Sequence, residues 1–423
     1  MINFSKTTLD NGLKIITAPI THTNTVSVLF LIGAGSRYET TRQNGLSHFL
    51  EHMFFKGTQK RPTSLDISRE LDAVGANYNA FTAEEYTGFY VRVEKTHFPL
   101  ALNILSDIIF NSKFSNPEID KEKGVILEEL NMYRDIPQRH VQDLAKKLLY
   151  GDTSLGRSTV GTKKTITSFA SQNFISYRDD FYTPNNMLVA IAGAGSQKNW
   201  LKAVKDQLGH LPKTGTKNYE KVENSQKKPE LLLEYKKTDQ THVVLGFKSF
   251  SRTDPRQPVL QLINNILGDT MSSRLFTEIR EKRGLAYYVS SDIWQFHETG
   301  AIQAALGADT KRAKEAIKVV LEEFKQIKEK GVTASELTQA KENFKGRLYL
   351  ELEESFAQAE FLAEQQLLKG KIKTPEELLK EIYKVSSSDI IKVAREIFKP
   401  ENLNLTIIGP YKDKKLFEKI LKI

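Results

Sequence analysis

The sequence contains no cysteine among its 423 residues, and this absence removes several kinds of site at once. Without cysteine there is no disulfide framework, no thiolate metal ligand and no cysteine nucleophile. The sequence also lacks an apolar run long enough to span a membrane, and its first residues resemble neither a signal peptide nor a transit peptide. We therefore expect a cytoplasmic protein that does not insert into membranes.

The charge balance is positive, with 61 Lys and Arg residues against 52 Asp and Glu residues and a formal net charge of +9. Such an excess raises the question of a nucleic-acid partner. The lysines are, however, mixed with glutamates along predicted helices, as in residues 322–330. Mixed charge of this kind is typical of a solvated helix surface. We expect no nucleic-acid partner, and the length predicts two or three domains.

The most informative segment is Gly-Leu-Ser-His-Phe-Leu-Glu-His-Met-Phe-Phe, residues 45–55. Its pattern predicts a helix that begins near Asn44 or Ser47. His48 and His52 are four residues apart, so they share a helix face, and Glu51 lies beside them. Two imidazoles on adjacent turns can hold zinc, and a neighbouring carboxylate can take the proton of an activated water molecule. We interpret the segment as a metal site, although two ordinary helical histidines would have the same spacing.

A further oxygen ligand could come from the helix that Asn116 and Pro117 begin. On this helix Glu122 and Glu129 are seven residues apart and share a face, whereas Glu128 points about a quarter-turn away from Glu129. Acidic residues on a helix are usually solvated, so the spacing alone leaves the choice of ligand open.

Short strands are predicted before and after the histidine helix. Asp-Asn-Gly at 10–12 is a hairpin signal between two strands, and residues 25–31 form an apolar, β-branched run. Residues 77–82 are polar at alternate positions, which is typical of an edge strand. Such a strand can accept a peptide as an added strand, or it can be a plain edge without a role.

The second half of the chain repeats the first. Residues 25–29 correspond to 241–245, and residues 184–193 correspond to 400–409, both at an offset of 216. A single offset over this distance predicts a duplicated domain. We expect a catalytic zinc-binding domain at 1–211, a polar, Lys-rich linker at 212–229 and a homologous domain at 230–423.

The duplicated half does not repeat the histidine pattern. At the same offset His48 corresponds to Asn264, and His52 corresponds to Gly268. This difference predicts one metal-binding domain and one partner domain, although divergence after duplication would also explain it.

The partner half has its own distinctive run at residues 273–288. It predicts a helix that ends near Gly284 and a strand that begins at Tyr287. Arg280 and Tyr287 could donate hydrogen bonds to a carbonyl oxygen or an oxyanion. From the residues alone, a surface arginine and a core tyrosine are the simpler interpretation.

The pattern His48-x-x-Glu51-His52, with Glu129 further on, resembles the inverzincin motif. Its context, His-Phe-Leu-Glu-His-Met-Phe-Phe-Lys-Gly-Thr, resembles the pitrilysin (insulinase) family of metallopeptidases and, within it, the processing-peptidase branch. The resemblance covers essentially the whole chain. It implies that His48, His52 and Glu129 bind Zn²⁺, that Glu51 is the general base and that Glu122 supports the site.

The same resemblance implies roles for the other two segments. Asn79, Ala80, Phe81 and Thr82 resemble the substrate-binding edge strand of the family. Arg280 and Tyr287 resemble an Arg/Tyr pair that the second half of the chain contributes to the active site.

For the fold, the resemblance implies the α+β class, with two homologous domains in which a mostly antiparallel sheet is packed with helices. Two such domains are half of the clamshell that longer members form, so a dimer is implied. A homodimer, with the Arg/Tyr pair acting on the partner's zinc, is the simplest assembly. A heterodimer with an inactive homologue is the alternative.

These expectations together describe a zinc metalloendopeptidase that cleaves peptides or unfolded protein segments in an enclosed chamber. The first alternative is a non-catalytic or narrow-specificity scaffold subunit of a larger complex. The second is a zinc hydrolase that does not act on peptides, which the edge strand argues against.

Overall fold

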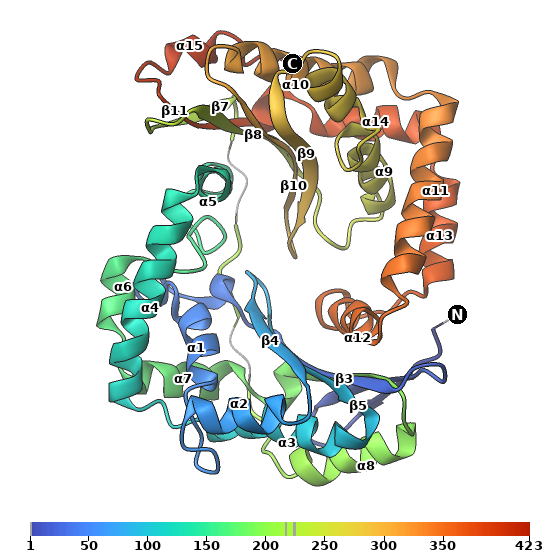
Figure 1. Cartoon of the computed structure of the whole chain (residues 1–423). Helices are drawn as coiled ribbons and strands as arrows, with labels where there is room; N and C mark the ends of the chain where they lie inside the picture. Colours follow the sequence, from blue (N-terminus) through green and yellow to red (C-terminus); the bar gives the residue numbers. More distant parts are fainter. Residues whose placement is uncertain (1, 216–217, 223–225) are drawn as a thin grey trace. The chain divides into compact units, whose positions relative to one another are not determined.

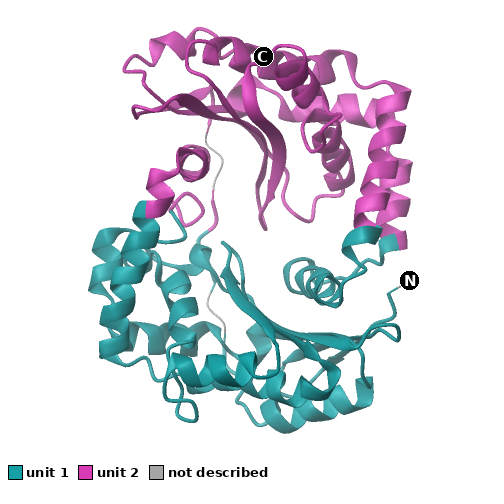
Figure 2. Cartoon of the chain, in the orientation of Figure 1, with its two compact units in different colours: residues 1–131, 158–220, 349–375 teal, residues 132–157, 221–348, 376–423 magenta. Residues whose placement is uncertain are grey.

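The chain folds into two compact units, which Figure 2 colours separately. The computed structural model describes residues 2–215, 218–222 and 226–423, so part of the predicted linker at 212–229 lies outside the described residues. Unit 1 comprises Met1–Asn131, Ser158–Glu220 and Tyr349–Pro375, and unit 2 comprises Met132–Arg157, Lys221–Leu348 and Glu376–Ile423. None of the helices in the described part of the chain combines the length and the apolarity that crossing a membrane requires.

Unit 1 is built on a six-stranded sheet with the strand order β1-β2-β6-β3-β5-β4 (Figure 1). The strands are β1 (Ser5–Thr8), β2 (Lys14–Pro19), β3 (Thr25–Ile32), β4 (Asn77–Thr82), β5 (Thr87–Glu94) and β6 (Met187–Gly193). Only β2 and β6 are parallel neighbours. The predicted hairpin of the first two strands is confirmed, and β4 lies at the edge of the sheet, as the sequence predicts.

Unit 2 is built on a five-stranded sheet with the order β7-β11-β8-β10-β9. The strands are β7 (Glu230–Tyr235), β8 (Gln240–Ser249), β9 (Ala286–Gln295), β10 (Gly300–Asp309) and β11 (Leu403–Gly409). Only β7 and β11 are parallel neighbours. Strand β11 lies 216 residues after β6 and occupies the same place beside the central strand, which agrees with the predicted duplication. The predicted α+β fold with two mostly antiparallel sheets is confirmed.

Helices surround both sheets (Figure 1). They are α1 (Leu46–Phe54), α2 (Ser64–Asp72), α3 (Phe98–Asn111), α4 (Asn116–Asp135), α5 (Pro137–Tyr150), α6 (Lys163–Ser168), α7 (Ser171–Phe181), α8 (Gln197–Leu208), α9 (Gln257–Leu267), α10 (Ala313–Lys330), α11 (Ala334–Glu351), α12 (Ser355–Glu364), α13 (Pro375–Lys384), α14 (Ser387–Ile397) and α15 (Lys415–Glu418). Two π-helices, η5 (Phe276–Glu281) and η6 (Gln365–Lys369), interrupt this pattern.

One helix of each unit comes from the opposite half of the sequence. In unit 1, α12 packs on β2, β3 and β6 through a buried cluster that includes Leu29, Ala190, Ala359 and Leu362. In unit 2, α5 packs on β8 and β11 through Val141 and Ala145. Each compact unit therefore differs from the continuous ranges 1–211 and 230–423, because each takes a crossing segment from the other half.

Helix α1 begins in an unusual way. Its first turn follows Gly45, which has φ +93°, and a Cβ atom at this position would lie 2.5 Å from the carbonyl oxygen of Val160. Glycine is required here because both the φ angle and the close backbone exclude a side chain. The residue before the helix supplies no side-chain cap.

The buried carboxylate of Glu39 caps α1 instead. Its Oε2 accepts the N–H of Gly45 at 2.8 Å, and its Oε1 accepts the N–H of Ser47 at 2.6 Å. A helix N-terminus attracts a negative charge, so this is a favourable place for a carboxylate. Burial nevertheless raises the pKa of the Glu39 carboxyl to about 7, although the hydrogen bonds from Ser47, Gly45 and Asn44 lower it.

We expect the pKa of Glu39 to give the protein a pH-dependent stability near neutrality. A carboxyl whose folded pKa lies above its unfolded value contributes stability that is complete below the unfolded pKa and is lost as the pH rises through about 7. The free energy of unfolding should fall by up to about 3 kcal/mol between pH 4.5 and pH 8 through this group. The Glu39→Gln variant, which cannot ionise, should lose this component when both proteins are unfolded in urea across that range.

Glu70→Gln serves as the control, because Glu70 is an exposed carboxylate paired with Arg61 in the same unit. It should leave the pH dependence of the wild type unchanged near neutrality. If Glu39→Gln showed the same pH profile as the wild type, Glu39 would be ionised throughout the range.

Candidate metal centre

The three predicted metal ligands lie together. His48 and His52 project from α1 and Glu129 projects from α4, with one ligand atom of each within 4.8 Å of the others. The Nε2 atoms of both histidines lie 3.6 Å from Oε2 of Glu129. All three side chains are half-buried. The neighbouring Glu128 is exposed and does not belong to the group, so the geometry favours Glu129 over Glu128.

The group fits a zinc ion. Two imidazole nitrogens and one carboxylate oxygen are a donor set that catalytic zinc sites use, and three protein ligands leave a further position for water or substrate. Within the described part of the chain, no other three His, Asp or Glu side chains bring their ligand atoms this close together.

The charge of the site also calls for a cation. Three carboxylates, those of Glu51, Glu122 and Glu129, surround the two imidazoles. Among the contacts described for this site, the one ammonium group is that of Lys56, which pairs with Glu122. If both histidines are neutral, three carboxylates and one ammonium group give the site a net negative charge. In size this charge equals that of one divalent cation. Such an excess is costly in a half-buried site unless a cation balances it.

Glu122 connects the ligands to their surroundings. Its Oε1 lies 2.9 Å from Nδ1 of His52, and its Oε2 lies 2.6 Å from Nζ of Lys56. Burial raises the pKa of Glu122, but the hydrogen bonds from His52 and Lys56 outweigh burial and lower it. A carboxylate that accepts the Nδ1 proton leaves Nε2 of His52 for the metal and fixes the ring. The supporting role that the family resemblance implies for Glu122 is consistent with these contacts.

The histidine rings themselves differ in their partners. Burial alone lowers the pKa of His52, yet the hydrogen bond with Glu122 and the charges of the nearby carboxylates raise it above its ordinary value. Nδ1 of His48 is buried, and the described residues offer it no hydrogen-bond partner. Glu122 therefore orients the ring of His52 through a charged hydrogen bond, whereas the ring of His48 is oriented by packing.

Glu51 is held from the edge strand. Oγ1 of Thr82, the last residue of β4, donates a hydrogen bond to Oε2 of Glu51 at 2.5 Å. This contact sets one oxygen of the predicted general base and places it next to the end of β4. The side chain of Glu51 is half-buried.

The main chain of β4 is open on one side, because β5 is its only neighbour in the sheet. The N–H of Ala83 bonds to Tyr86 in the hairpin, so the alternation of antiparallel pairing directs the N–H and C=O groups of Tyr78, Ala80 and Thr82 away from β5. The edge could therefore add a further strand, as the sequence allowed.

The four residues of the predicted substrate run differ in what they offer. The ring of Phe81 lies over Gly88, where a Cβ atom would approach it to 2.2 Å, and packs 6.0 Å from the ring of Tyr86. Asn79 accepts the N–H of Ala80 at 2.9 Å through its side chain. Phe81 therefore serves the sheet surface, whereas Ala80 and Thr82 present their main chain to the open side.

Arg280 and Tyr287 also lie together, in unit 2. The guanidinium of Arg280 lies 5.6 Å from the ring centroid of Tyr287 and 4.9 Å from that of Phe276. Tyr287 is 76% exposed, so the interpretation as a core tyrosine is wrong. Tyr287 is the extra residue of a β-bulge, because Gly307 pairs with Tyr288 and Ala308 pairs with Ala286. A bulge re-aims a side chain, which explains the exposure.

The helix that carries Arg280 differs from the prediction. Residues 276–281 form a π-helix, η5, and the chain reverses at Gly284 with φ +56°. A π-helix is uncommon and often marks a functional site. Hydrophobic spacing cannot distinguish it from an α-helix, so the sequence predicts only a regular helix here.

Glu39 and Lys56 were missed as well. Glu39 lies seven residues before the first residue of the helix that it caps, beyond any local capping pattern. Lys56 could have been found, because it is four residues after His52 and only two residues beyond the end of the same helix.

Comparison with known proteins identifies the family to which this chain belongs. Two family models match in succession: Insulinase (Peptidase family M16) over residues 14–163 and Peptidase M16 inactive domain over residues 168–344. An uncharacterized zinc protease of Bacillus subtilis, YmxG, is 36% identical over 95% of this chain and 97% of its own length. An uncharacterized zinc protease of Streptomyces coelicolor is 34% identical over 97% and 90%. The crystal structure of a protease from Helicobacter pylori matches with a TM-score of 0.92 at 21% identity, covering 97% of this chain and all of that one. The chain belongs to the insulinase family of peptidases, family M16.

Proposed function

We propose that this protein is a zinc-dependent endopeptidase that cleaves peptides or unfolded protein segments. The observation that carries the proposal is the convergence of His48, His52 and Glu129 within 4.8 Å, with Glu51 on the same helix as the histidines. The relatives named zinc proteases support both the metal and the reaction class. When bound, zinc supplies the Lewis acidity that makes water a competent nucleophile near neutral pH.

Glu51 acts as the general base. Its carboxylate takes a proton as water attacks the peptide carbonyl and passes that proton to the leaving amine. The hydrogen bond from Thr82 occupies Oε2, so Oε1 is the oxygen left for the proton. Glu122 keeps the ring of His52 in the orientation that ligation needs.

The substrate binds as an added strand on β4. Main-chain hydrogen bonds to the open side of Tyr78 and Thr82, and to the carbonyl oxygen of Ala80, whose N–H bonds to Asn79, would supply affinity that is independent of the substrate sequence. Because the same Thr82 also contacts Glu51, a strand bound at this end of β4 passes beside the general base. This supports an extended or unfolded substrate rather than a folded domain.

Arg280 and Tyr287 bind the reacting carbonyl in this proposal. The guanidinium and the exposed phenol are hydrogen-bond donors, and donors directed at a developing oxyanion stabilise it. We assign residues 230–423 as the homologous domain that supplies this pair, and the family name of the second match, an inactive domain, supports a division of labour. The family resemblance favours an enclosed chamber in a homodimer, with the pair acting on the partner's zinc, over a heterodimer. A cytoplasmic location also stays a prediction.

We expect Glu51→Gln to abolish cleavage while zinc stays bound. Removing a general base lowers turnover by about 10²–10⁴-fold, and the amide keeps the size of the side chain. The measurement is the cleavage rate of a quenched, unstructured peptide by the wild type and the variant, with the zinc content of both samples determined in parallel.

Each result has a distinct meaning. A variant that binds zinc but does not cleave supports the proposal. A wild type that binds zinc but leaves a broad set of peptides intact would favour the scaffold or narrow-specificity alternative. A wild type without zinc would contradict the metal site.

Glu129→Gln should weaken zinc binding, because a neutral amide replaces the anionic ligand. We expect an affinity at least about tenfold lower, measured by competition with a chelator of known strength. Glu128→Gln is the matched control, since it makes the same change one residue away on an exposed position of α4. Equal affinities for the two variants would remove Glu129 from the ligand set.

A further inference from the structure

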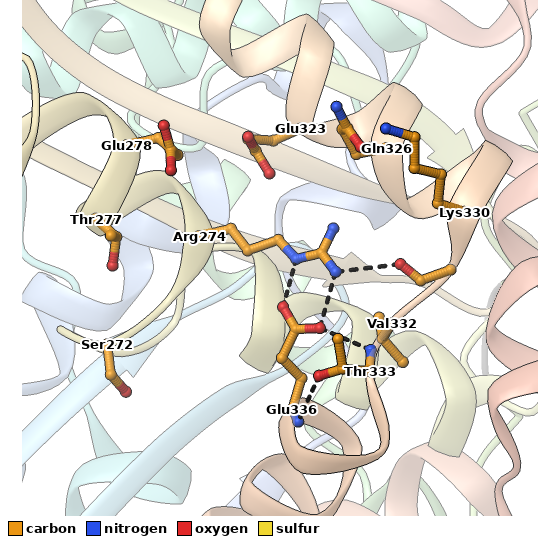
Figure 3. Close-up of a pocket in the computed structure, with 11 residues that line it drawn as sticks. Ser272, Arg274, Thr277, Glu278, Glu323, Gln326, Lys330, Val332, Thr333 and Glu336 are labelled. Carbon is orange, nitrogen blue, oxygen red and sulfur yellow. Dashed lines mark hydrogen bonds and ion pairs between the residues drawn. The ribbon is translucent and has the colours of Figure 1, made fainter.

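Arg274 in unit 2 makes a two-point ion pair that no part of the proposed mechanism uses. Its Nε lies 2.6 Å from Oε1 of Glu336, and its Nη2 lies 2.9 Å from Oε2 of the same carboxylate (Figure 3). Nη2 also donates to the carbonyl oxygen of Gly331 at 3.1 Å. A forked guanidinium–carboxylate pair is among the most directional polar contacts in proteins. We refer to Arg274, Glu336 and Gly331 as the Arg274 clamp.

The clamp is anchored on a rigid helix end. Glu336 lies in the first turn of α11, where its Oε2 accepts the N–H of Thr333 at 2.8 Å and its own N–H donates to Oγ1 of Thr333 at 3.1 Å. The guanidinium of Arg274 lowers the pKa of Glu336, against the effect of burial, to about 2. The carboxylate is therefore ionised and paired near neutral pH.

The clamp forms one wall of a polar cavity of about 540 Å³. Figure 3 shows Glu278 and Glu323 on the opposite wall, above the guanidinium. Arg274 and Glu336 are 18% and 29% exposed, so solvent weakens the pair only in part. The clamp borders the same cavity as η5, because Thr277 and Glu278 of that helix also line it.

Arg274 stands two residues before the π-helix η5, which carries Arg280. A π-helix is rare and occurs mostly as a single-turn bulge that accommodates one extra residue in an α-helix, and such a departure persists where the surrounding contacts hold it. The inner face is held by Leu275 and Ile279, which are fully buried. The clamp holds the start of the segment.

The far end of η5 has its own ties. The N–H of Leu285 bonds to the carbonyl oxygen of Ile279 at 2.8 Å, and Gly284 turns the chain with φ +56°. Arg312 donates to the carbonyl oxygen of Arg283 at 3.0 Å. With the far end tied in this way, release of the clamp removes the side-chain tie at the start of η5 and leaves there the burial of Leu275 and the hydrogen bond from the N–H of Thr277 to the carbonyl oxygen of Ser273.

Loss of the π-helical register would move Arg280. If η5 relaxed to an α-helix, the extra residue would rotate the following side chains by about 100° around the axis. The guanidinium of Arg280 would then leave the ring of Tyr287, which it faces at 5.6 Å.

We propose that Arg274 is a positioning residue for the Arg280–Tyr287 pair. Through Glu336 it ties the start of η5 to the first turn of α11 and so preserves the register that turns Arg280 toward Tyr287. The inference rests on the proposed function, because it gains a catalytic meaning only if that pair serves the substrate.

Peptide cleavage by the zinc-loaded protein tests the proposal. Arg274→Ala should lower kcat/KM by about 10–100-fold, the effect expected when reacting groups are misplaced by about 1 Å. Zinc content should stay equal to that of the wild type. Arg274→Lys, which keeps the charge but loses the fork, should fall between the two.

Arg256→Ala is the matched control. Arg256 makes a comparable pair with Asp254 and Glu396 in unit 2, away from η5. Its removal should change kcat/KM by less than about twofold, even where thermal melting shows a similar loss of stability. An equal loss of activity in Arg256→Ala and Arg274→Ala would reduce Arg274 to a general structural role and overturn the inference.

A double-mutant cycle separates positioning from general stability. If Arg274 acts through the pair, Arg274→Ala should lower activity much less in a Tyr287→Phe background than in the wild type. Additive effects would overturn the inference. A normal rate for Arg274→Ala beside a slow Tyr287→Phe would overturn the inference and leave the proposed function standing. An unaffected Tyr287→Phe would overturn the catalytic role of Tyr287, and with it the inference.

Discussion

The requirement that both faces of each sheet be covered governs this structure. The interior strands β6 and β11 are buried along their whole length, so neither sheet can leave a face in water. In each unit most helices come from the same half of the sequence, and the remaining cover crosses over from the other half. Small side chains make this possible in unit 1, where Ala359 and Ala363 of α12 share a buried cluster with Ala190 and Ala192 of β6. A hydrogen bond of 2.8 Å between Ser27 and Ser355 adds direction to that contact.

This exchange has a consequence for folding. Neither half of the sequence can complete its core alone, because α12 begins at Ser355, in the second half of the chain, whereas the first sheet ends at Gly193. Burial of an apolar face stabilises by roughly 25 cal/mol per Å² of apolar surface, and the exposed face of an incomplete sheet would lose that contribution. The two halves therefore depend on one another through packing, in addition to any dependence that catalysis creates.

The core of the metal centre could be predicted from the sequence because its determinants are local. His48, Glu51 and His52 lie within one turn and a half of a single helix, where the spacing alone fixes which side chains share a face. Predicting Glu129 as the third ligand required knowledge of a tertiary contact. The helix pattern narrowed the candidate ligands only to the acidic residues of α4. Glu39 and the crossing of α5 and α12 could not be predicted, since each depends on a contact between residues far beyond any local period.

The two irregular elements of unit 2 show where sequence patterns stop being informative. The π-helix at residues 276–281 and the β-bulge at Tyr287 each insert one residue against the regular period of the element. An insertion of this kind disrupts regular pairing and persists only where the surrounding structure holds it. Both insertions fall at the residues that the family resemblance connects with the reacting carbonyl. The departure from regular geometry therefore carries information that the hydrophobic pattern lacks: it marks the residues whose side chains have been turned out of the core and toward solvent.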